Sequence, residues 1–391
     1  MNFSPAAPIW RGSFMRASNE RQTHLSRTNT INLGAYYTAP NHVQTAWRML
    51  EETLPPDTIV FDNACGYGGF LRGGKNEIAC DIDPHAAASA RARHPKAKVF
   101  CANALANVSR QRFDIPESAR LLLIGNPPFN DRTSQIRQSV KAATTDDEMD
   151  ADLQTRDLGI SFLRSYDKLR ADWVCVLHPL SYLIKRTNFA RLGSFAHNYS
   201  LQRAVVISSA EFPDNSQNTP FPVVVALYVR GAGMSHDNIC HFRFHTDDTT
   251  FAVSDFQYLD DFVQKYPRIP DTNDLSGIMF YTMRDINALR RNRTFVFDNS
   301  KNGVPINRKQ LPYYIYADVF KQHLHHIPYY FGNSNIMIDA PLFERKWRWF
   351  VSDSARRHPQ LSDYIDVQIV DDSAKPIEKY FRNLLRSHYV D

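Results

Sequence analysis

Long apolar runs are missing from this chain: none approaches a membrane span, and the Asn- and Arg-rich start lacks a secretory apolar region. Cysteine is scarce, and it mostly falls at expected strands or strand ends rather than in paired metal-ligand spacing. The five cysteines are Cys65, Cys80, Cys101, Cys175 and Cys240. We therefore expect reduced thiols and a soluble protein of a reducing compartment, the cytoplasm.

Two further kinds of site lack their usual residues. No convincing Asp…Glu-x-Lys nuclease constellation occurs, and no second glycine-rich nucleotide turn follows the first. His323, His325 and His326 form a cluster, but no cysteine or carboxylate stands at convincing ligand spacing around it, and a closed zinc site needs four ligands. We expect no metal. The formal net charge of +5 is mild, so it permits nucleic-acid binding without demonstrating it.

Strand-like and helix-like segments alternate through the first part of the chain. The expected strands lie at about 57–62, 77–81, 97–101, 120–125, 172–178, 203–208 and 222–229. The expected helices lie near 41–53, 84–94, 155–170 and 182–197. This alternation predicts an α/β fold with a doubly wound parallel sheet, and ligands of such sheets lie outside the carboxyl ends of the strands.

A glycine-rich turn follows the first expected strand. Cys65-Gly66-Tyr67-Gly68-Gly69-Phe70 comes soon after Ile59-Val60-Phe61-Asp62, and glycines let the backbone approach a ligand closely. The next expected strand ends in Asp81-Ile82-Asp83-Pro84. The Asp81 carboxylate could accept both hydroxyls of a ribose, or it could belong to a helix N-cap region. Turn and carboxylate together imply a nucleoside cofactor.

Asn126-Pro127-Pro128-Phe129 ends the apolar run Leu121-Leu122-Leu123-Ile124. This motif suits methylation of an amino nitrogen on a planar substrate, which is a poor nucleophile because its lone pair is delocalised. The Asn126 side-chain oxygen and the Pro127 carbonyl can each accept one N–H hydrogen bond, and Phe129 offers a stacking face. Pro127 and Pro128 stiffen the turn. The alternative interpretation is a Pro-rich turn with a core Phe.

With these motifs in this order, most of the first 230 residues resemble the class I S-adenosylmethionine-dependent methyltransferases, specifically the DNA adenine-N6 enzymes with a C-terminal target-recognition domain. The resemblance implies a Rossmann-like seven-stranded sheet followed by a β-rich or mixed C-terminal domain. It implies S-adenosyl-L-methionine as cofactor and double-stranded DNA as partner. The expected catalytic domain covers residues 1–235, and the expected DNA-binding target-recognition domain covers 236–391.

The resemblance also assigns residues. The segment Gly34 to Pro40 is similar to the family's Tyr-Thr-Pro segment, which closes over the methionine end of the cofactor. The implied cofactor contacts are Tyr37, Thr38, Asp62, Cys65, Gly66, Gly68, Asp81, Ile82, Asn103, Ala104 and Asn126. The implied catalytic residues are Asn126, Pro127, Pro128 and Phe129. Glu211-Phe212-Pro213 resembles the motif that holds an extruded base, so the base is expected between Phe129 and Phe212, with Phe221 as the alternative to Phe212.

Three positions depart from the family pattern. Asn63 stands where the family has Pro, Ala39 interrupts Thr-Pro, and Asn103-Ala104 replaces an acidic-aromatic pair. The Asn103 side-chain oxygen could still accept from the amino group of the cofactor, but without a charge. Cofactor affinity is therefore modest, or Leu105 provides the missing wall.

Near Gly231 to Ser235 the alternation ends, and the rest of the chain turns aromatic and basic. Aromatic clusters lie at 313–316, 329–331 and 347–350, interleaved with basic ones at 290–293, 308–309 and 345–346. Arg and Lys can neutralise phosphates and aromatic residues can stack on bases; the alternative is an aromatic core with solvated basic loops. The polar segment from Asn130 to Arg156 is either a mobile loop over the site or an ordinary connection.

The sequence thus predicts a site-specific, adenine-specific DNA methyltransferase that flips its base out of the duplex, in a restriction-modification or epigenetic role. A separate cognate restriction endonuclease would perform any cleavage. Two alternatives stay open. The same two acceptors fit an RNA adenine or a protein glutamine amide, and the chain could be a non-catalytic scaffold that binds the cofactor and nucleic acid.

Overall fold

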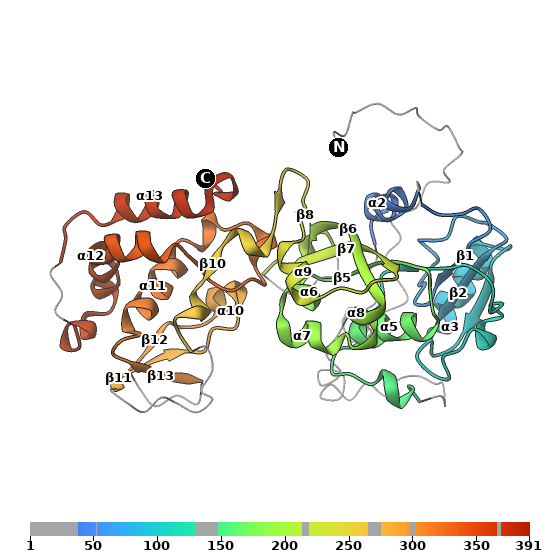
Figure 1. The fold of residues 1–391 in the computed structure, drawn as a ribbon, viewed down its shortest axis with the longest axis horizontal. Helices are drawn as coiled ribbons and strands as arrows, with labels where there is room; N and C mark the ends of the chain where they lie inside the picture. Colours follow the sequence, from blue (N-terminus) through green and yellow to red (C-terminus); the bar gives the residue numbers. More distant parts are fainter. Residues whose placement is uncertain are drawn as a thin grey trace.

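The computed structural model describes residues 38–51, 53–129, 148–212, 219–264, 275–297, 302–365 and 369–391. They form two lobes, a larger one built on a broad sheet and a smaller one rich in helices (Figure 1). Tyr37, Pro213 and the segment 130–147 lie outside the described residues, so the predictions made for them stay predictions.

The larger lobe holds a nine-stranded sheet in the order β3-β2-β1-β4-β5-β7-β6-β8-β9. Its strands are β1 (Ile59–Asp62), β2 (Glu77–Asp81), β3 (Lys98–Cys101), β4 (Leu121–Gly125), β5 (Trp173–Pro179), β6 (Tyr199–Ser208), β7 (Pro222–Arg230), β8 (Phe244–His245) and β9 (Thr250–Phe251). Strands β1 to β5 pair in parallel, whereas β7 runs antiparallel to both β5 and β6. The expected α/β fold with a Rossmann-like sheet is confirmed, and two short strands extend it beyond the expected seven.

The strands are apolar on both faces because helices and loops cover both sides of the sheet. Alternate residues point to opposite faces of a strand. Phe61, Leu121, Leu123, Val174 and Val176 belong to one hydrophobic cluster. Val60, Leu122, Ile124, Cys175 and Leu177 belong to another on the opposite face. This double burial explains the continuous apolar runs that marked the strands in the sequence.

Short helices surround the sheet. They are α2 (Pro40–Leu50), α3 (Pro84–Arg93), α5 (Leu158–Lys168), α6 (Ser181–Ile184), α7 (Arg186–Arg191), α8 (Ser194–Asn198) and α9 (His236–His241). Helix α2 packs on β5 and β7, and α5 packs against α8. The single helix expected near 182–197 is three short helices, because Lys185 and Gly193 leave the helical conformation between them.

The smaller lobe is mixed and dominated by helices. Its helices are α10 (Ile286–Arg291), α11 (Leu311–Gln322), α12 (Ala340–Arg357) and α13 (Ala374–Leu385). Its strands are β10 (Gln257–Tyr258), β11 (Leu275–Tyr281), β12 (Phe295–Val296), β13 (Gly303–Asn307) and β14 (Met337–Ile338), which form two small antiparallel sheets. Helix α12 packs between α11 and α13. None of the helices in the described part of the chain has the length and apolar character that a membrane crossing needs.

Aromatic side chains build the core of the smaller lobe. The ring of Tyr316, which is fully buried, contacts the rings of Phe343, Phe350 and Tyr380 at centroid distances of 5.1, 5.6 and 5.8 Å. Tyr314 is buried as well. For these residues the aromatic-core interpretation is correct, and they are not available to stack on bases.

The two lobes share one continuous hydrophobic cluster. The Tyr329 hydroxyl of the smaller lobe donates to the Val206 carbonyl of β6 at 3.0 Å, and Lys185 pairs with Asp285 across the junction. Strands β8 and β9 join the large sheet although they follow residue 235. The division into a catalytic and a recognition domain at that residue remains a proposal.

Candidate active site

The carboxyl ends of β1, β2 and β4 bring three predicted site residues to one edge of the sheet. Asp62 ends β1, Asp81 ends β2, and Asn126 follows β4. Strand β1 lies between the other two, paired in parallel with both. The approach is close enough to require glycine at position 125, because a Cβ there would lie 2.6 Å from the Asp62 Oδ1 atom.

Asp81 organises the glycine-rich turn. Its Oδ2 atom accepts a hydrogen bond from the Gly66 amide at 2.7 Å, and its Oδ1 atom accepts one from the Asp83 amide at 2.9 Å. Gly66 and Gly68 have φ values of 53° and 79°, which only glycine adopts readily. Burial raises the pKa of Asp81, and the two amide donors oppose that rise. Each carboxylate oxygen keeps a lone pair for a hydroxyl donor from a ligand.

Asp62 is the most unusual group of the edge. Its side chain is 1% exposed, and its Oδ1 atom accepts from the Ala64 amide at 3.2 Å. Its Oδ2 atom is buried without a hydrogen-bond partner among the described residues. Burial, reinforced by the charge of Asp81 and opposed by the Ala64 amide, raises the pKa of Asp62 to about 8. An unsatisfied buried carboxylate oxygen is costly unless a ligand supplies a donor or a positive charge.

The same edge carries two cysteines that the sequence placed at strand ends. Cys65 is buried, and its amide donates to the Cys80 carbonyl at 3.0 Å. Burial raises the pKa of the Cys65 thiol, and the nearby Asp62 and Asp81 carboxylates raise it further. A thiol that stays protonated in this way acts as an apolar wall rather than as a nucleophile.

Asn126 contacts the segment that precedes α2. Its Nδ2 atom donates to the Thr38 hydroxyl at 3.1 Å, so the expected cofactor-closing segment reaches the Asn-Pro-Pro-Phe motif. Pro127 is buried, whereas Asn126, Pro128 and Phe129 are half-buried. The motif is therefore partly accessible at the edge of the sheet.

Phe129 lies against the start of α5. A Cβ on Gly159 would come within 3.1 Å of the Phe129 Cβ atom and 2.7 Å of the Tyr182 hydroxyl. Asp157 caps α5 by accepting from the Gly159 amide at 3.1 Å, and Tyr182 donates to the same carboxylate oxygen. We did not single out Tyr182 from the sequence. Asp directly before a helix is a typical N-cap residue, so the sequence does carry a signal for Asp157.

The segment after β3 folds back on itself. The Asn103 Oδ1 atom accepts from the Leu105 amide at 3.0 Å, and Ala104 and Leu105 are both buried. Asp150 fixes the next turn, since its two oxygens accept from the Asn107 and Val108 amides at 2.6 and 2.9 Å. Asp150, shortly before α5, therefore lies beside the segment that carries Asn103, a contact between residues distant in sequence.

Phe212 and Phe129 pack in different hydrophobic clusters. Phe129 packs against the cluster that contains Phe61, whereas Phe212, 4% exposed, belongs to the cluster on the opposite face. The Phe212 ring lies 6.1 Å from the His42 ring. Phe221 is half-buried against the same cluster as Phe212. The role of either residue in holding a base stays a prediction.

No protein-family model matches the sequence, and no curated protein matches it. Solved structures resemble the chain at low identity. A protein from Vibrio vulnificus YJ016, described as a modification subunit of a type I restriction enzyme, is 17% identical over 54% of this chain and 46% of its own, with a TM-score of 0.37. The M protein of the type I restriction enzyme EcoKI is 14% identical over 52% and 46%, with a TM-score of 0.36. A Pyrococcus horikoshii protein described as an RNA methyltransferase is 16% identical over 51% and 88%, with a TM-score of 0.35.

The larger lobe has the class I methyltransferase fold. Strands β1 to β7 lie in the order β3-β2-β1-β4-β5-β7-β6, and β7 is the one among these seven that runs antiparallel to its neighbours. This chain spans about half the length of the first of these solved chains. The activities named in the descriptions of those proteins are not assigned to this chain.

Proposed function

We propose that this protein is a DNA methyltransferase that transfers a methyl group from S-adenosylmethionine to the N6 atom of adenine at a specific site. One observation carries the proposal: the Asn-Pro-Pro-Phe motif leaves β4 at the sheet edge where Asp62 ends the adjacent strand β1 and Asp81 ends β2, the strand beyond it. Nucleotide ligands of α/β sheets bind at this edge, and the amino-group acceptors stand beside it.

The residues present fit the cofactor. Asp81 would accept from the ribose hydroxyls, and the glycine turn that it organises would let the backbone approach the ligand. The buried oxygen of Asp62 would take a donor or cation from the ligand, which suits a molecule with ammonium and sulfonium charges. Thr38, Cys65, Ile82, Asn103 and Ala104 would complete the walls. When bound, the cofactor supplies an electrophilic methyl group on a good leaving group.

The Asn-Pro-Pro-Phe motif would handle the substrate amino group. The Asn126 side-chain oxygen and the Pro127 carbonyl would each accept one N–H bond, which localises the nitrogen lone pair toward the methyl carbon. The Nδ2 atom of Asn126 donates to Thr38, which fixes the orientation of the side-chain amide whose oxygen would be the acceptor. Phe129, whose Cβ atom packs closely against Gly159, would stack on the base.

A target adenine inside a duplex has to leave the stack to reach this edge, at a cost of roughly a few kcal/mol. Phe212 or Phe221 would hold the base on its other side. The smaller lobe would bind the DNA, as expected for a modification enzyme or modification subunit. A cognate restriction endonuclease would be a separate protein.

The test is single-turnover transfer of labelled methyl to long, mixed-sequence DNA from a host without adenine methylation. Asn126→Ala should slow transfer by on the order of 10²–10³ while cofactor and DNA still bind, because the lost acceptor matters most in the transition state. Asn198→Ala is the matched control: this amide of the same lobe donates to the Asp167 carboxylate at 2.9 Å, directly before β6, at the edge of the sheet opposite to the motif.

Two outcomes would overturn the proposal. Wild-type transfer rates in Asn126→Ala would make the motif structural. Label found in RNA or protein but absent from DNA adenine would move the activity to one of the alternative substrates.

A further inference from the structure

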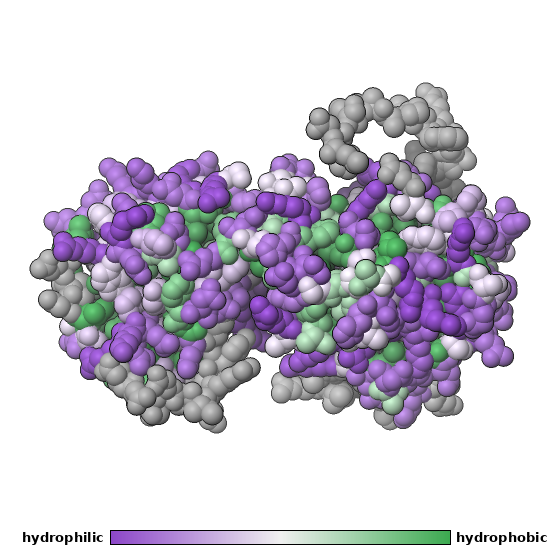
Figure 2. Space-filling view, viewed as in Figure 1, coloured by the Kyte–Doolittle hydropathy of each residue, from purple (hydrophilic) through white to green (hydrophobic). Residues whose placement is uncertain are grey.

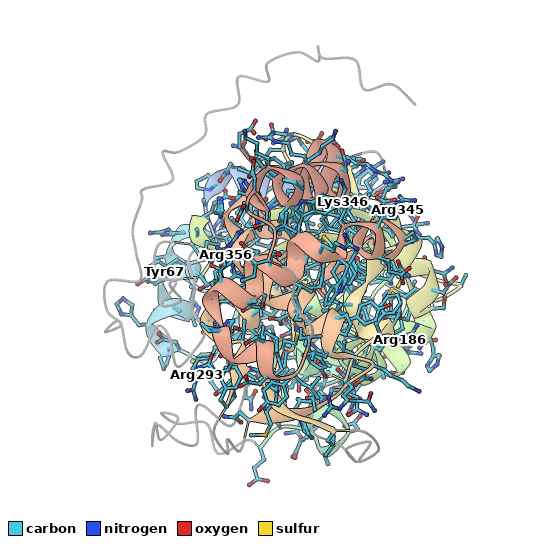
Figure 3. The ribbon with its side chains drawn as sticks, turned by 90° about the vertical axis from the view of Figure 1, so that its left-hand side faces the viewer. Tyr67, Arg186, Arg293, Arg345, Lys346 and Arg356 are labelled. Carbon is cyan, nitrogen blue, oxygen red and sulfur yellow. The ribbon has the colours of Figure 1, made fainter. Side chains whose placement is uncertain are left out.

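A cationic cavity lies in the smaller lobe, between β12, the end of α11 and the end of α12. Its volume is about 250 Å³, and its lining residues are Arg293, Thr294, Phe295, Asp318, Lys321, Gln322, Arg357 and His358. Three of them are basic side chains, and one is a carboxylate. Figure 3 shows Arg293 at the lower end of this lobe, far from Arg345 and Lys346 at its upper end.

The charge of the single carboxylate is offset by an ion pair with Arg357, which also pairs with Asp353. Asp318 is fully buried, and its Oδ1 atom accepts from the Thr294 hydroxyl at 2.6 Å and from His358 Nε2 at 3.0 Å. Its Oδ2 atom accepts from the Ser354 hydroxyl at 2.8 Å and from Arg357 at 2.7 Å. Asp318 therefore fixes the positions of Arg357 and His358 on the cavity wall.

Positive charge remains after this pairing. Lys321 donates to the Asn292 carbonyl and forms no ion pair with any carboxylate in the described ranges; burial lowers its pKa, and Asp318 opposes that shift. The Nε atom of Arg357 is buried without a hydrogen-bond partner among those same residues. Arg293 is exposed at the mouth. An anion in the cavity would compensate the Lys321 charge, which burial otherwise disfavours.

We propose that this cavity binds a backbone phosphate of the DNA, and so fixes the position of the smaller lobe on the duplex. The inference rests on the proposed function, because it takes DNA as the substrate. The rim favours a nucleotide phosphate over a bare inorganic ion: the Phe297 ring, 44% exposed, lies 6.3 Å from the His358 ring and gives the cavity an apolar border for a sugar. Backbone contacts of this kind set the register of a protein on DNA without reading sequence.

The experiment measures DNA affinity by fluorescence anisotropy across a salt series, with the full chain. Arg293→Gln and Lys321→Gln each remove one cavity charge, and Arg345→Gln removes one exposed charge at the far end of the same lobe. Each cavity variant should lower the slope of log affinity against log salt by about 0.9, the value for one lost phosphate contact, and should weaken binding several-fold. Arg345→Gln should change neither quantity.

Equal effects in all three variants would overturn the site, because they would reflect net charge alone. A second arm titrates the wild-type chain with inorganic phosphate and follows the His358 ring by NMR. Phosphate binding at the cavity together with unchanged DNA affinity in Arg293→Gln would assign the cavity to a free anion and overturn the DNA assignment.

Methyl transfer by the wild-type chain to DNA adenine is measured in parallel. If transfer occurs and the cavity variants bind DNA normally, the inference fails alone. If the wild-type chain neither binds nor methylates DNA, the proposed function is wrong, and this inference is wrong with it.

Discussion

Two carboxylates, one in each lobe, are almost completely buried and yet have opposite surroundings. Asp318 in the smaller lobe accepts four hydrogen bonds. Burial acts to raise the pKa of Asp318, but the hydrogen bond from His358 and the charge of Arg357 lower it to about 2. Asp62 at the sheet edge accepts a hydrogen bond from the Ala64 amide, and burial raises its pKa to about 8. The fold satisfies both oxygens of Asp318, whereas the Oδ2 atom of Asp62 has no hydrogen-bond partner among the described residues.

The contrast separates structural from functional burial of charge. A buried carboxylate with paired cations holds side chains in place, and its loss leaves those cations exposed to an apolar interior. A buried carboxylate without partners destabilises the fold in its charged form, and such groups are found mainly where a ligand or a reaction needs them. Figure 2 shows hydrophilic residues over much of the visible surface of both lobes, so surface polarity alone does not distinguish the two regions.

The largest expected effect is on stability. Asp318→Asn should lower the free energy of unfolding by roughly 3–5 kcal/mol, because Arg357 and His358 lose their buried partner. Asp62→Asn should not lower it at pH 8. The raised folded pKa of Asp62 means that its contribution to stability falls as pH rises from about 4 to about 8, and the neutral amide removes that loss. Urea unfolding of both variants at pH 8 measures the difference; equal destabilisation would refute the contrast.

The next effect is on cofactor affinity at the sheet edge. Asp81→Ala should weaken S-adenosylmethionine binding by about 1.5–3 kcal/mol, the range for a charge-assisted hydrogen bond. Asp260→Ala, a surface carboxylate of the chain that leads into the smaller lobe, is the control and should leave it unchanged. Calorimetric titration provides the measurement. Unchanged affinity in Asp81→Ala would remove the ribose assignment.

A smaller effect concerns pH. The positively charged cofactor should bind the ionised form of Asp62, so affinity should rise by about tenfold, or ~1.4 kcal/mol, between pH 7 and pH 9 as the group ionises with a pKa of about 8. Titration in buffers of different ionisation enthalpy should detect one released proton. In Asp62→Asn both the pH dependence and the proton release should disappear, and their persistence would show that another group titrates.

The smallest effect tests the support behind Phe129. Tyr182→Phe removes the hydroxyl that donates to Asp157, a change of about 0.5–1.5 kcal/mol for one hydrogen bond. We expect a modest loss of methyl transfer with little change in cofactor affinity. The Tyr182 hydroxyl and Phe129 both pack against Gly159, whereas Asp81 organises a different segment, the glycine-rich turn. Tyr329→Phe, which removes the hydroxyl bonded to Val206, controls for the loss of a hydroxyl elsewhere. Equal transfer rates in the two variants would show that Tyr182 has no special role.

The sequence by itself determined where the seven main strands lie, because both-sided burial demands the continuous apolar runs that it contains. It also determined that Asp62, Asp81 and Asn126 share an edge, since parallel strands end together. It located Gly66 and Gly68, whose positive φ values few other residues tolerate.

Only the tertiary structure decided the rest. Partners distant in sequence determine whether a buried carboxylate is satisfied, as Asp318 is by Thr294 and His358, or left short of donors, as Asp62 is. The same holds for Phe212, which lies on the opposite face of the sheet from the cluster against which Phe129 packs. Local pattern fixes secondary structure, but burial, charge pairing and the sign of a pKa shift depend on contacts that form only when the lobes pack.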